Sequence, residues 1–128
     1  MNELSAFSGF SMDDTERAKA FYADTLGQDV TVQKEGLKIV LKNGGEVFLY
    51  QKSDHAPATF TVLNFVVSNI TETIASLKEK GLTLENYDMG PMKADEHGIY
   101  RGIAAGQGPD IAWFKDPAGN ILSVIQPV

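Results

Sequence analysis

The chain has 128 residues, 43% of them hydrophobic, which is the size and composition of one ordinary globular domain. Its net charge of −6 and its scattered basic residues argue against nucleic-acid binding, because phosphates need a basic face. The absence of cysteine excludes disulfides and thiolate metal sites, and no apolar run approaches the ~18 residues of a membrane helix. Without a basic segment before an apolar one at its start, the sequence predicts a cytoplasmic protein.

The first predicted elements are a short strand around residues 7–12 and a helix after it. Asp14 is a good N-cap, because its side-chain oxygen accepts backbone N–H groups that lack partners in the first turn. Apolar residues then recur at helical spacing as far as Gly27, which suits the left-handed position at a helix end. Residues 37–51, LKIVLKNGGEVFLYQ, are typical of a strand, a turn and a second strand.

A second copy of this pattern follows the turn-prone linker SDHAPAT, residues 53–59. Asn69 is the second predicted N-cap, 55 residues after Asp14, and Gly81 ends its helix. Residues 111–126, IAWFKDPAGNILSVIQ, again indicate strand, turn and strand, with a turn that we take as two residues longer than the first. Aligning these hairpins at an offset of 74 residues pairs Leu49 with Ser123.

The second copy is interrupted by a glycine-rich loop at about residues 88–109, with a short strand predicted around 99–101. A long loop in a compact domain is often functional, so both a lid over a pocket and a plain excursion are open readings. The sequence thus predicts a single α+β domain over 1–128. Its two modules, about 1–53 and 60–128, each have the order strand, helix, strand, strand, strand.

Two motifs stand out beside the repeat, DTERAKAFYADTLG at residues 14–27 and DPAGN at residues 116–120. The motifs and the repeat resemble the vicinal oxygen chelate superfamily of glyoxalases, bleomycin-resistance proteins and dioxygenases. The resemblance implies two βαβββ modules whose curved mixed sheets surround a cleft. It also implies that a chain of this length pairs as a homodimer. It does not identify an activity, because one fold carries many functions.

Metal-dependent members of that superfamily bind a divalent ion with side chains from strands of both modules. Carried over to this chain, the ligand positions hold Phe7, Leu49, Val62 and Ser123, which do not form a donor set for a divalent metal. With these residues at the positions that the resemblance assigns to the ligands, we expect no metal and no cofactor. His55 in the linker and His97 in the loop are interpreted as exposed loop residues or, alternatively, as a general base or ligand contact.

Alternation along the strands predicts which side chains line the cleft. One face of the first strand carries Gly9 and Ser11, and the matching face of the second module carries Asn64. This mostly apolar lining with a few polar groups is typical of a small-molecule site, although the same residues could fill a curved sheet. The candidate ligand-binding residues are Phe7, Gly9, Ser11, Leu49, His55, Val62, Asn64, Tyr100, Arg101 and Ser123.

Three functions are compatible with this pattern, and none comes with an assignable catalytic residue. The resemblance and the unsuitable ligand positions favour a metal-free protein that binds a small molecule, as in the bleomycin-resistance branch. The first alternative is a metal-dependent enzyme of the glyoxalase or dioxygenase type with an atypical site. The second is a metal-free lyase or isomerase that uses one of the two histidines. No nucleic acid or membrane partner is predicted.

Overall fold

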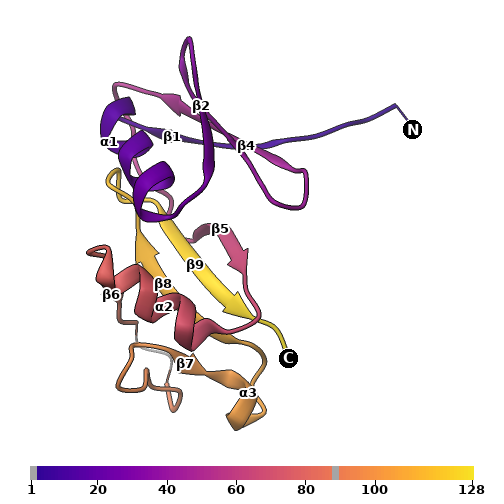
Figure 1. Cartoon of the computed structure of the whole chain (residues 1–128), viewed down its shortest axis with the longest axis vertical. Coiled ribbons are helices and arrows are strands. Elements are labelled where there is room, and N and C mark those ends of the chain that lie inside the picture. Colours follow the sequence, from indigo (N-terminus) through magenta and orange to yellow (C-terminus); the bar gives the residue numbers. More distant parts are fainter. Residues whose placement is uncertain (1–2, 88–89) are drawn as a thin grey trace. The chain divides into compact units, whose positions relative to one another are not determined.

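The computed structural model describes residues 3–87 and 90–128, and the chain divides into two compact units, Met1–Pro57 and Ala58–Val128. Each unit contains a strand, a helix and further strands that form one sheet, so the predicted repeat and the α+β class are confirmed (Figure 1). The division falls inside the predicted linker, while a single domain over the whole chain stays a prediction. Two residues of the predicted loop, Asp88 and Met89, lie outside the described ranges.

Unit 1 consists of a four-stranded sheet and one helical segment. Its sheet has the order β1-β4-β3-β2, in which β1 and β4 are parallel and the other neighbours are antiparallel. The elements are β1 (Ser8–Met12), α1 (Thr15–Lys19), the π-helix η1 (Ala20–Thr25), β2 (Asp29–Gln33), β3 (Gly36–Val40) and β4 (Glu46–Gln51).

Both ends of the first helical segment form as predicted. The Asp14 side chain accepts a hydrogen bond from the Arg17 backbone N–H at 3.2 Å, which caps α1. The last turns widen into a π-helix, in which the Leu26 N–H donates to the Phe21 carbonyl at 3.0 Å. Gly27 then takes a φ of 65°, where a glycine is favoured.

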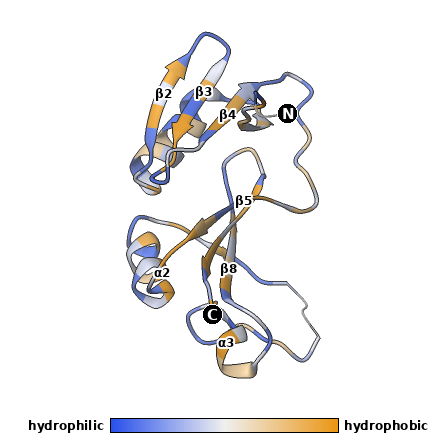
Figure 2. Ribbon diagram, turned by 90° about the vertical axis from the view of Figure 1, so that its right-hand side faces the viewer, coloured by the Kyte–Doolittle hydropathy of each residue, from blue (hydrophilic) through white to orange (hydrophobic). Residues whose placement is uncertain are grey.

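Unit 2 repeats this arrangement, with β9 between β5 and β8 (Figure 1). Its helix α2 packs on β8 and β9, and Figure 2 shows hydrophilic and hydrophobic residues alternating around that helix. No helix in the described part of the chain is long and apolar enough to cross a membrane. The elements are β5 (Thr61–Val66), α2 (Ile70–Glu79), β6 (Leu84–Glu85), β7 (Tyr100–Arg101), α3 (Gly102–Ala105), β8 (Asp110–Lys115) and β9 (Ile121–Gln126).

The edge strand of the second sheet is interrupted. Strand β6 pairs with one half of β8, through Glu85 and Trp113, and β7 pairs with the other half, through Tyr100 and Ile111. Together they take the place that β2 occupies in unit 1, and the described residues between them, 86–87 and 90–99, belong to no named strand. The predicted short strand near residue 100 is confirmed. Helix α3 was not predicted, because four residues are too few to show apolar periodicity.

Each sheet buries the face that is turned toward its helix. Along β1, β4 and β8 the buried side chains alternate with more exposed ones, as a sheet covered on one side requires, whereas three successive residues of β9, 122–124, are all buried. Burying this apolar surface provides the main stabilisation of each unit. The unit 1 core includes Phe10, Met12, Tyr22, Leu37, Ile39, Val47 and Leu49, and the unit 2 core includes Ile70, Ile74, Ala112, Phe114, Leu122 and Val124.

The two hairpins have turns of equal length, so the predicted offset of 74 residues was wrong. The N–H of Leu41 donates to the Gly45 carbonyl at 2.8 Å, and the N–H of Asp116 donates to the Asn120 carbonyl at 3.0 Å. These equivalent bonds lie 75 residues apart, as do the strand ends that follow them. Phe48, rather than Leu49, therefore corresponds to Ser123.

Candidate functional site

The open face of the unit 1 sheet, which is turned away from its helix, carries two of the predicted cleft residues. Gly9 and Ser11 alternate along β1 with buried Phe10 and Met12, so the predicted division of this strand into two faces is confirmed. Phe7 precedes β1 and is 69% exposed.

Leu49, which we predicted on the open face, pairs with Phe10 and lies on the buried face instead. The one-residue error in the repeat alignment explains the misplacement, because neighbouring residues of a strand point to opposite faces. Phe48 takes the open-face position and pairs with Gly9.

The linker places a histidine against this face. Ser11 Oγ and His55 Nδ1 are hydrogen-bonded at 2.6 Å, although the two residues lie 44 positions apart. The His55 backbone N–H also donates to the Lys52 carbonyl at 3.1 Å, which holds the linker in a turn. A hydrogen-bonded serine and histidine can exchange a proton, so this geometry is compatible with the predicted role of His55 as a base or ligand contact.

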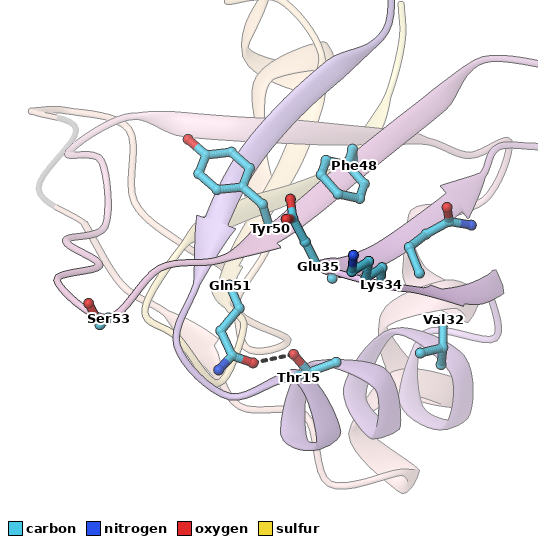
Figure 3. A pocket seen from close by; sticks show the side chains of 10 residues that line it. Thr15, Val32, Lys34, Glu35, Phe48, Tyr50, Gln51 and Ser53 are labelled. Atoms are coloured by element: carbon cyan, nitrogen blue, oxygen red, sulfur yellow. Dashed lines mark hydrogen bonds between the residues drawn. The ribbon is translucent and has the colours of Figure 1, made fainter.

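A broad pocket of about 910 Å³ opens at the end of the unit 1 sheet where the β2–β3 hairpin meets the end of β4 (Figure 3). The aromatic rings of Phe48 and Tyr50 stack there, with centroids 6.3 Å apart and an interplanar angle of 25°. This volume is within the range of pockets that bind small molecules. The lining residues are Thr15, Val32, Gln33, Lys34, Glu35, Gly36, Phe48, Tyr50, Gln51 and Ser53.

Two local features fix the shape of this pocket. The Thr15 hydroxyl donates to the side-chain amide oxygen of Gln51, which ties the start of α1 to the end of β4 (Figure 3). Gly36 begins β3 so close to β4 that a Cβ there would lie 1.9 Å from the Leu49 carbonyl oxygen. Only a residue without a side chain permits this approach of the two strands.

In unit 2 the open face brings together two predicted residues, Asn64 and Ser123. The buried Ser123 hydroxyl donates to the Asn64 side-chain oxygen, and the two residues pair between β5 and β9. Asn64 itself is exposed, so its amide group is presented on this face in a fixed orientation. Val62 lies where the pairing of β5 with β9 skips a residue, and it has no partner in that register.

Trp113 explains why a small residue stands at position 123. Its indole N–H donates to the Thr61 hydroxyl at 3.1 Å, so the ring extends from β8 across β9 to β5. Ser123 is the residue of β9 that pairs with Trp113, and it is fully buried. A larger side chain at this position would meet the indole ring.

Two tyrosines pack edge-on against the same indole. The ring centroids of Tyr87 and Tyr100 lie 5.5 Å and 5.2 Å from that of Trp113. The Tyr100 hydroxyl donates to Asn86 Oδ1 at 2.7 Å and accepts from the Tyr87 backbone N–H at 2.6 Å, so it joins the two ends of the excursion over residues 86–99. Because its side chain is buried and its hydroxyl is engaged, Tyr100 supports the open face rather than presenting a free polar group.

The Tyr87 hydroxyl has a different environment. It is buried and makes no hydrogen bond with any residue in 3–87 or 90–128. The pKa of this phenol is raised above its ordinary value, mainly by burial and to a smaller extent by the nearby Glu85 carboxylate. Tyr87 therefore stays neutral over the physiological pH range.

Arg101 links Asp95, in the segment between β6 and β7, to the face of the sheet that α2 covers. Its guanidinium binds the Asp95 carboxylate at 2.7 Å, the Asp110 carboxylate at 3.3 Å and the Thr71 hydroxyl at 2.8 Å. Thr71 belongs to α2, so this predicted ligand-binding residue lies on the face opposite to Ser123. Burial alone would raise the pKa of Asp95, but hydrogen bonds from Arg101 and from two backbone N–H groups hold it below the ordinary range.

We expect this cluster to make the protein sensitive to acid. Because the pKa of Asp95 is lowered by folding, its stabilising contribution is complete above the ordinary Asp value of ~3.9 and is lost as the pH falls below it. Asp95→Asn should lower the free energy of unfolding at pH 7 by about 1–2 kcal/mol and reduce its fall between pH 5 and 3. Urea unfolding across this range measures both effects.

The matched control for this prediction is Asp54→Asn, which removes the exposed ion pair with Lys52. Exposed ion pairs contribute little, so its pH profile should follow that of the unchanged protein. If Asp95→Asn retains the full acid sensitivity, the cluster does not have the role assigned to it.

The residues at the positions that bind the metal in metal-dependent superfamily members are not suited to a divalent ion in this chain. With the corrected alignment they hold Phe7, Phe48, Val62 and Ser123, and the one oxygen among these side chains is a neutral hydroxyl that is bonded to Asn64. In the described part of the chain, no three His, Cys, Asp or Glu side chains group closely enough to hold a metal. These residues therefore do not supply the oxygen and nitrogen donors that a divalent metal requires.

The sequence interpretation missed Phe48, Glu35 and Gly36 as pocket residues. Phe48 could have been found by comparing the two turns, because Gly44 and Gly119 both have the positive φ of the same turn position. Glu35 and Gly36 belong to a hairpin whose contribution to a pocket has no sequence signal. The binding roles of Phe7, Gly9, Ser11, His55, Val62, Asn64, Ser123, Tyr100 and Arg101 stay predictions.

A comparison with models of protein families identifies the family of this chain. The family model described as Glyoxalase/Bleomycin resistance protein/Dioxygenase superfamily matches residues 9–124. Among curated proteins, none matches the sequence significantly.

Solved structures show the same fold at low sequence identity. A glyoxalase family protein from Bacillus anthracis has a TM-score of 0.68 and 18% identity, covering 100% of this chain and 99% of that one. TnmS3, an antibiotic binding protein from Streptomyces sp. CB03234, has a TM-score of 0.66 and 23% identity, covering 98% of both chains. The fosfomycin resistance protein FosX from Listeria monocytogenes has a TM-score of 0.68 and 11% identity, covering 100% and 96%.

Proposed function

Since the chain belongs to the glyoxalase/bleomycin resistance protein/dioxygenase superfamily, we propose that it is a metal-free protein that binds a small molecule. The observation that carries this proposal is the unit 1 pocket of about 910 Å³ with two stacked aromatic rings. Its lining combines these rings with polar and charged side chains, which can fix the orientation of a bound small molecule. The antibiotic binding protein TnmS3, which shares the fold, supports the same class of function.

The chemistry of the donor positions supports binding without a metal. Phe48 and Ser123 occupy corresponding places in the two sheets, and neither supplies a carboxylate or imidazole. Phe48 instead contributes to the aromatic wall of the pocket, and Ser123 leaves space for the Trp113 ring. In this proposal, Phe48 therefore forms part of the surface that faces the ligand, and Ser123 serves the packing of the sheet.

We also propose that the protein is a cytoplasmic homodimer. Strand β5 is an edge strand whose last residue, Val66, is 71% exposed, and Phe60, which precedes the strand, is 68% exposed. Large exposed apolar side chains on an open edge favour association. Sedimentation equilibrium should give the mass of a dimer, and a monomer at micromolar concentration would contradict the proposal.

Two measurements test the proposed function. Protein purified without chelator should contain far less than one equivalent of Ni, Zn, Mn or Fe, and a thermal-shift screen of small aromatic compounds should find ligands that raise Tm. A ligand present at 100 times its Kd stabilises a protein by about 2.7 kcal/mol, which is readily detected. Phe48→Ala should abolish the shift, whereas Leu4→Ala, at an exposed residue outside the pocket, should retain it.

Either of two results would contradict this function. The first is one tightly bound metal per chain that is lost when residues of the open faces are changed. The second is a screen in which no compound stabilises the protein.

A further inference from the structure

We propose that the unit 1 pocket binds an organic cation, with the positive group beside the Glu35 carboxylate and an apolar or flat part against the Phe48 and Tyr50 rings. This inference rests on the proposed function and names its ligand class. The three residues come from the β2–β3 hairpin and β4, and all line the same pocket. Figure 3 shows the Glu35 side chain extending toward the side of the pocket that holds the two rings.

The aromatic wall is the first part of the argument. The faces of aromatic rings carry negative electrostatic potential and attract ammonium and other organic cations. Tyr50 is 39% exposed and Phe48 is half-buried, so the wall is reachable from solvent. The two rings are nearly parallel, with an angle of 25° between them, and a flat ligand can lie along them.

The distribution of charge is the second part. Two lysines near the rings are already paired: Lys38, which lies opposite Phe48 on β3, with Glu46 at 3.8 Å, and Lys52 with Asp54 at 2.7 Å. The Glu35 carboxylate, in contrast, makes no ion pair or hydrogen bond with any described residue. The net charge of −6 adds a long-range field that raises the local concentration of cations.

Lys34 provides an internal test of this assignment. It is adjacent to Glu35, lines the same pocket and likewise makes no ion pair within the described residues. A cationic ligand requires the carboxylate of Glu35 and is repelled by Lys34. An anionic ligand would have the reverse requirement. Neutralising each residue in turn therefore separates the two ligand classes at one location.

The experiment is an NMR titration of the full chain with three benzyl compounds that differ in charge. Benzyltrimethylammonium is the cation, benzyl alcohol the neutral compound and phenylacetate the anion. We expect the cation to bind most tightly and to shift the backbone amide resonances of Gly36, Tyr50 and Gln51. Glu35→Gln should weaken its binding roughly two- to fivefold, and Lys34→Gln should leave it unchanged or strengthen it. Both residues are exposed, so neither change should affect folding.

The possible outcomes distinguish a wrong ligand class from a wrong proposed function. Phenylacetate binding more tightly than the cation, with loss on Lys34→Gln, would overturn the cation assignment and leave small-molecule binding intact. Equal binding of all three compounds, unaffected by Glu35→Gln, would have the same consequence. If none of the three shifts these resonances while compounds from the thermal-shift screen still stabilise the protein, the assignment of this pocket to a cation is wrong. A screen without any ligand contradicts the proposed function itself.

Discussion

Gly36→Ala is expected to lower the free energy of unfolding by about 3 kcal/mol. The added methyl group would lie 1.9 Å from the Leu49 carbonyl oxygen and 3.0 Å from the Tyr50 Cα, and both are backbone atoms that cannot rotate away. Overpacking of this kind forces strands apart and costs about 1–3 kcal/mol, with larger values where backbone meets backbone. Urea unfolding followed by circular dichroism measures the change. Because Gly36 lines the pocket, ligand binding should weaken as well.

The control for this prediction lies in the next hairpin. At Gly45 a Cβ would meet its nearest neighbours at 3.6 Å, an ordinary contact, and no positive φ opposes a side chain. Gly45→Ala should therefore change the free energy of unfolding by no more than about 0.5 kcal/mol. Equal stability of the two variants would show that β3 and β4 can separate here without cost.

Trp113→Ala is the second change for which we expect a large loss, of about 3 kcal/mol. The substitution removes the ring that crosses β9 and the edge-on contacts with Tyr87 and Tyr100. Large aromatic residues replaced by alanine typically cost ~3–5 kcal/mol, and the half-buried position of Trp113 places it at the lower end. Unfolding should be followed by circular dichroism, because Trp113 is the one tryptophan of the sequence.

Two further variants separate the ring from its hydrogen bond. Thr61→Val removes the acceptor of the indole N–H and should cost only about 1 kcal/mol. Trp113→Phe keeps an aromatic ring against the two tyrosines and should recover more than half of the loss. If Thr61→Val costs as much as Trp113→Ala, the hydrogen bond rather than the packing of the ring holds β8 to β5.

The parts of the fold that depend on close neighbours in sequence were predictable. Asn69 accepts the Glu72 N–H at 3.1 Å, three residues on, and Asp116 accepts the Ala118 and Asn120 N–H groups at 2.9 Å. Each of these bonds closes within four residues, so the local sequence contains both partners. The helix starts and the second turn were therefore placed correctly.

The register of the last strands was not predictable in the same way. Strand β4 carries Val47, Phe48 and Leu49 in succession, and β9 is apolar on both of its faces. Alternation assigns faces only where polar and apolar residues take turns. With no such alternation, a shift of one residue could not be detected, and Leu49 was placed on the wrong face.

Contacts between distant parts of the chain carried the least sequence signal. Nothing in the linker pattern places His55 against Ser11, because their hydrogen bond depends on how residues 52–55 turn back over β1. The pocket formed by the β2–β3 hairpin and β4 likewise depends on the close approach at Gly36. Residue types were sufficient to suggest a site, but tertiary structure decides which of them meet.

Because its edge strand is interrupted, unit 2 can accept inserted or exchanged sequences at this edge of the sheet. The chain leaves the sheet after β6 and re-enters it at β7, and both of these strands pair with β8. The length of the segment between them can therefore vary without changing the pairing of β8 with β9. Tyr100 binds Asn86 and Tyr87 at the start of the segment and Arg101 binds Asp95 within it, so an exchanged segment needs to keep these anchors. Evolution or protein engineering can diversify this segment while the sheet beneath it stays constant.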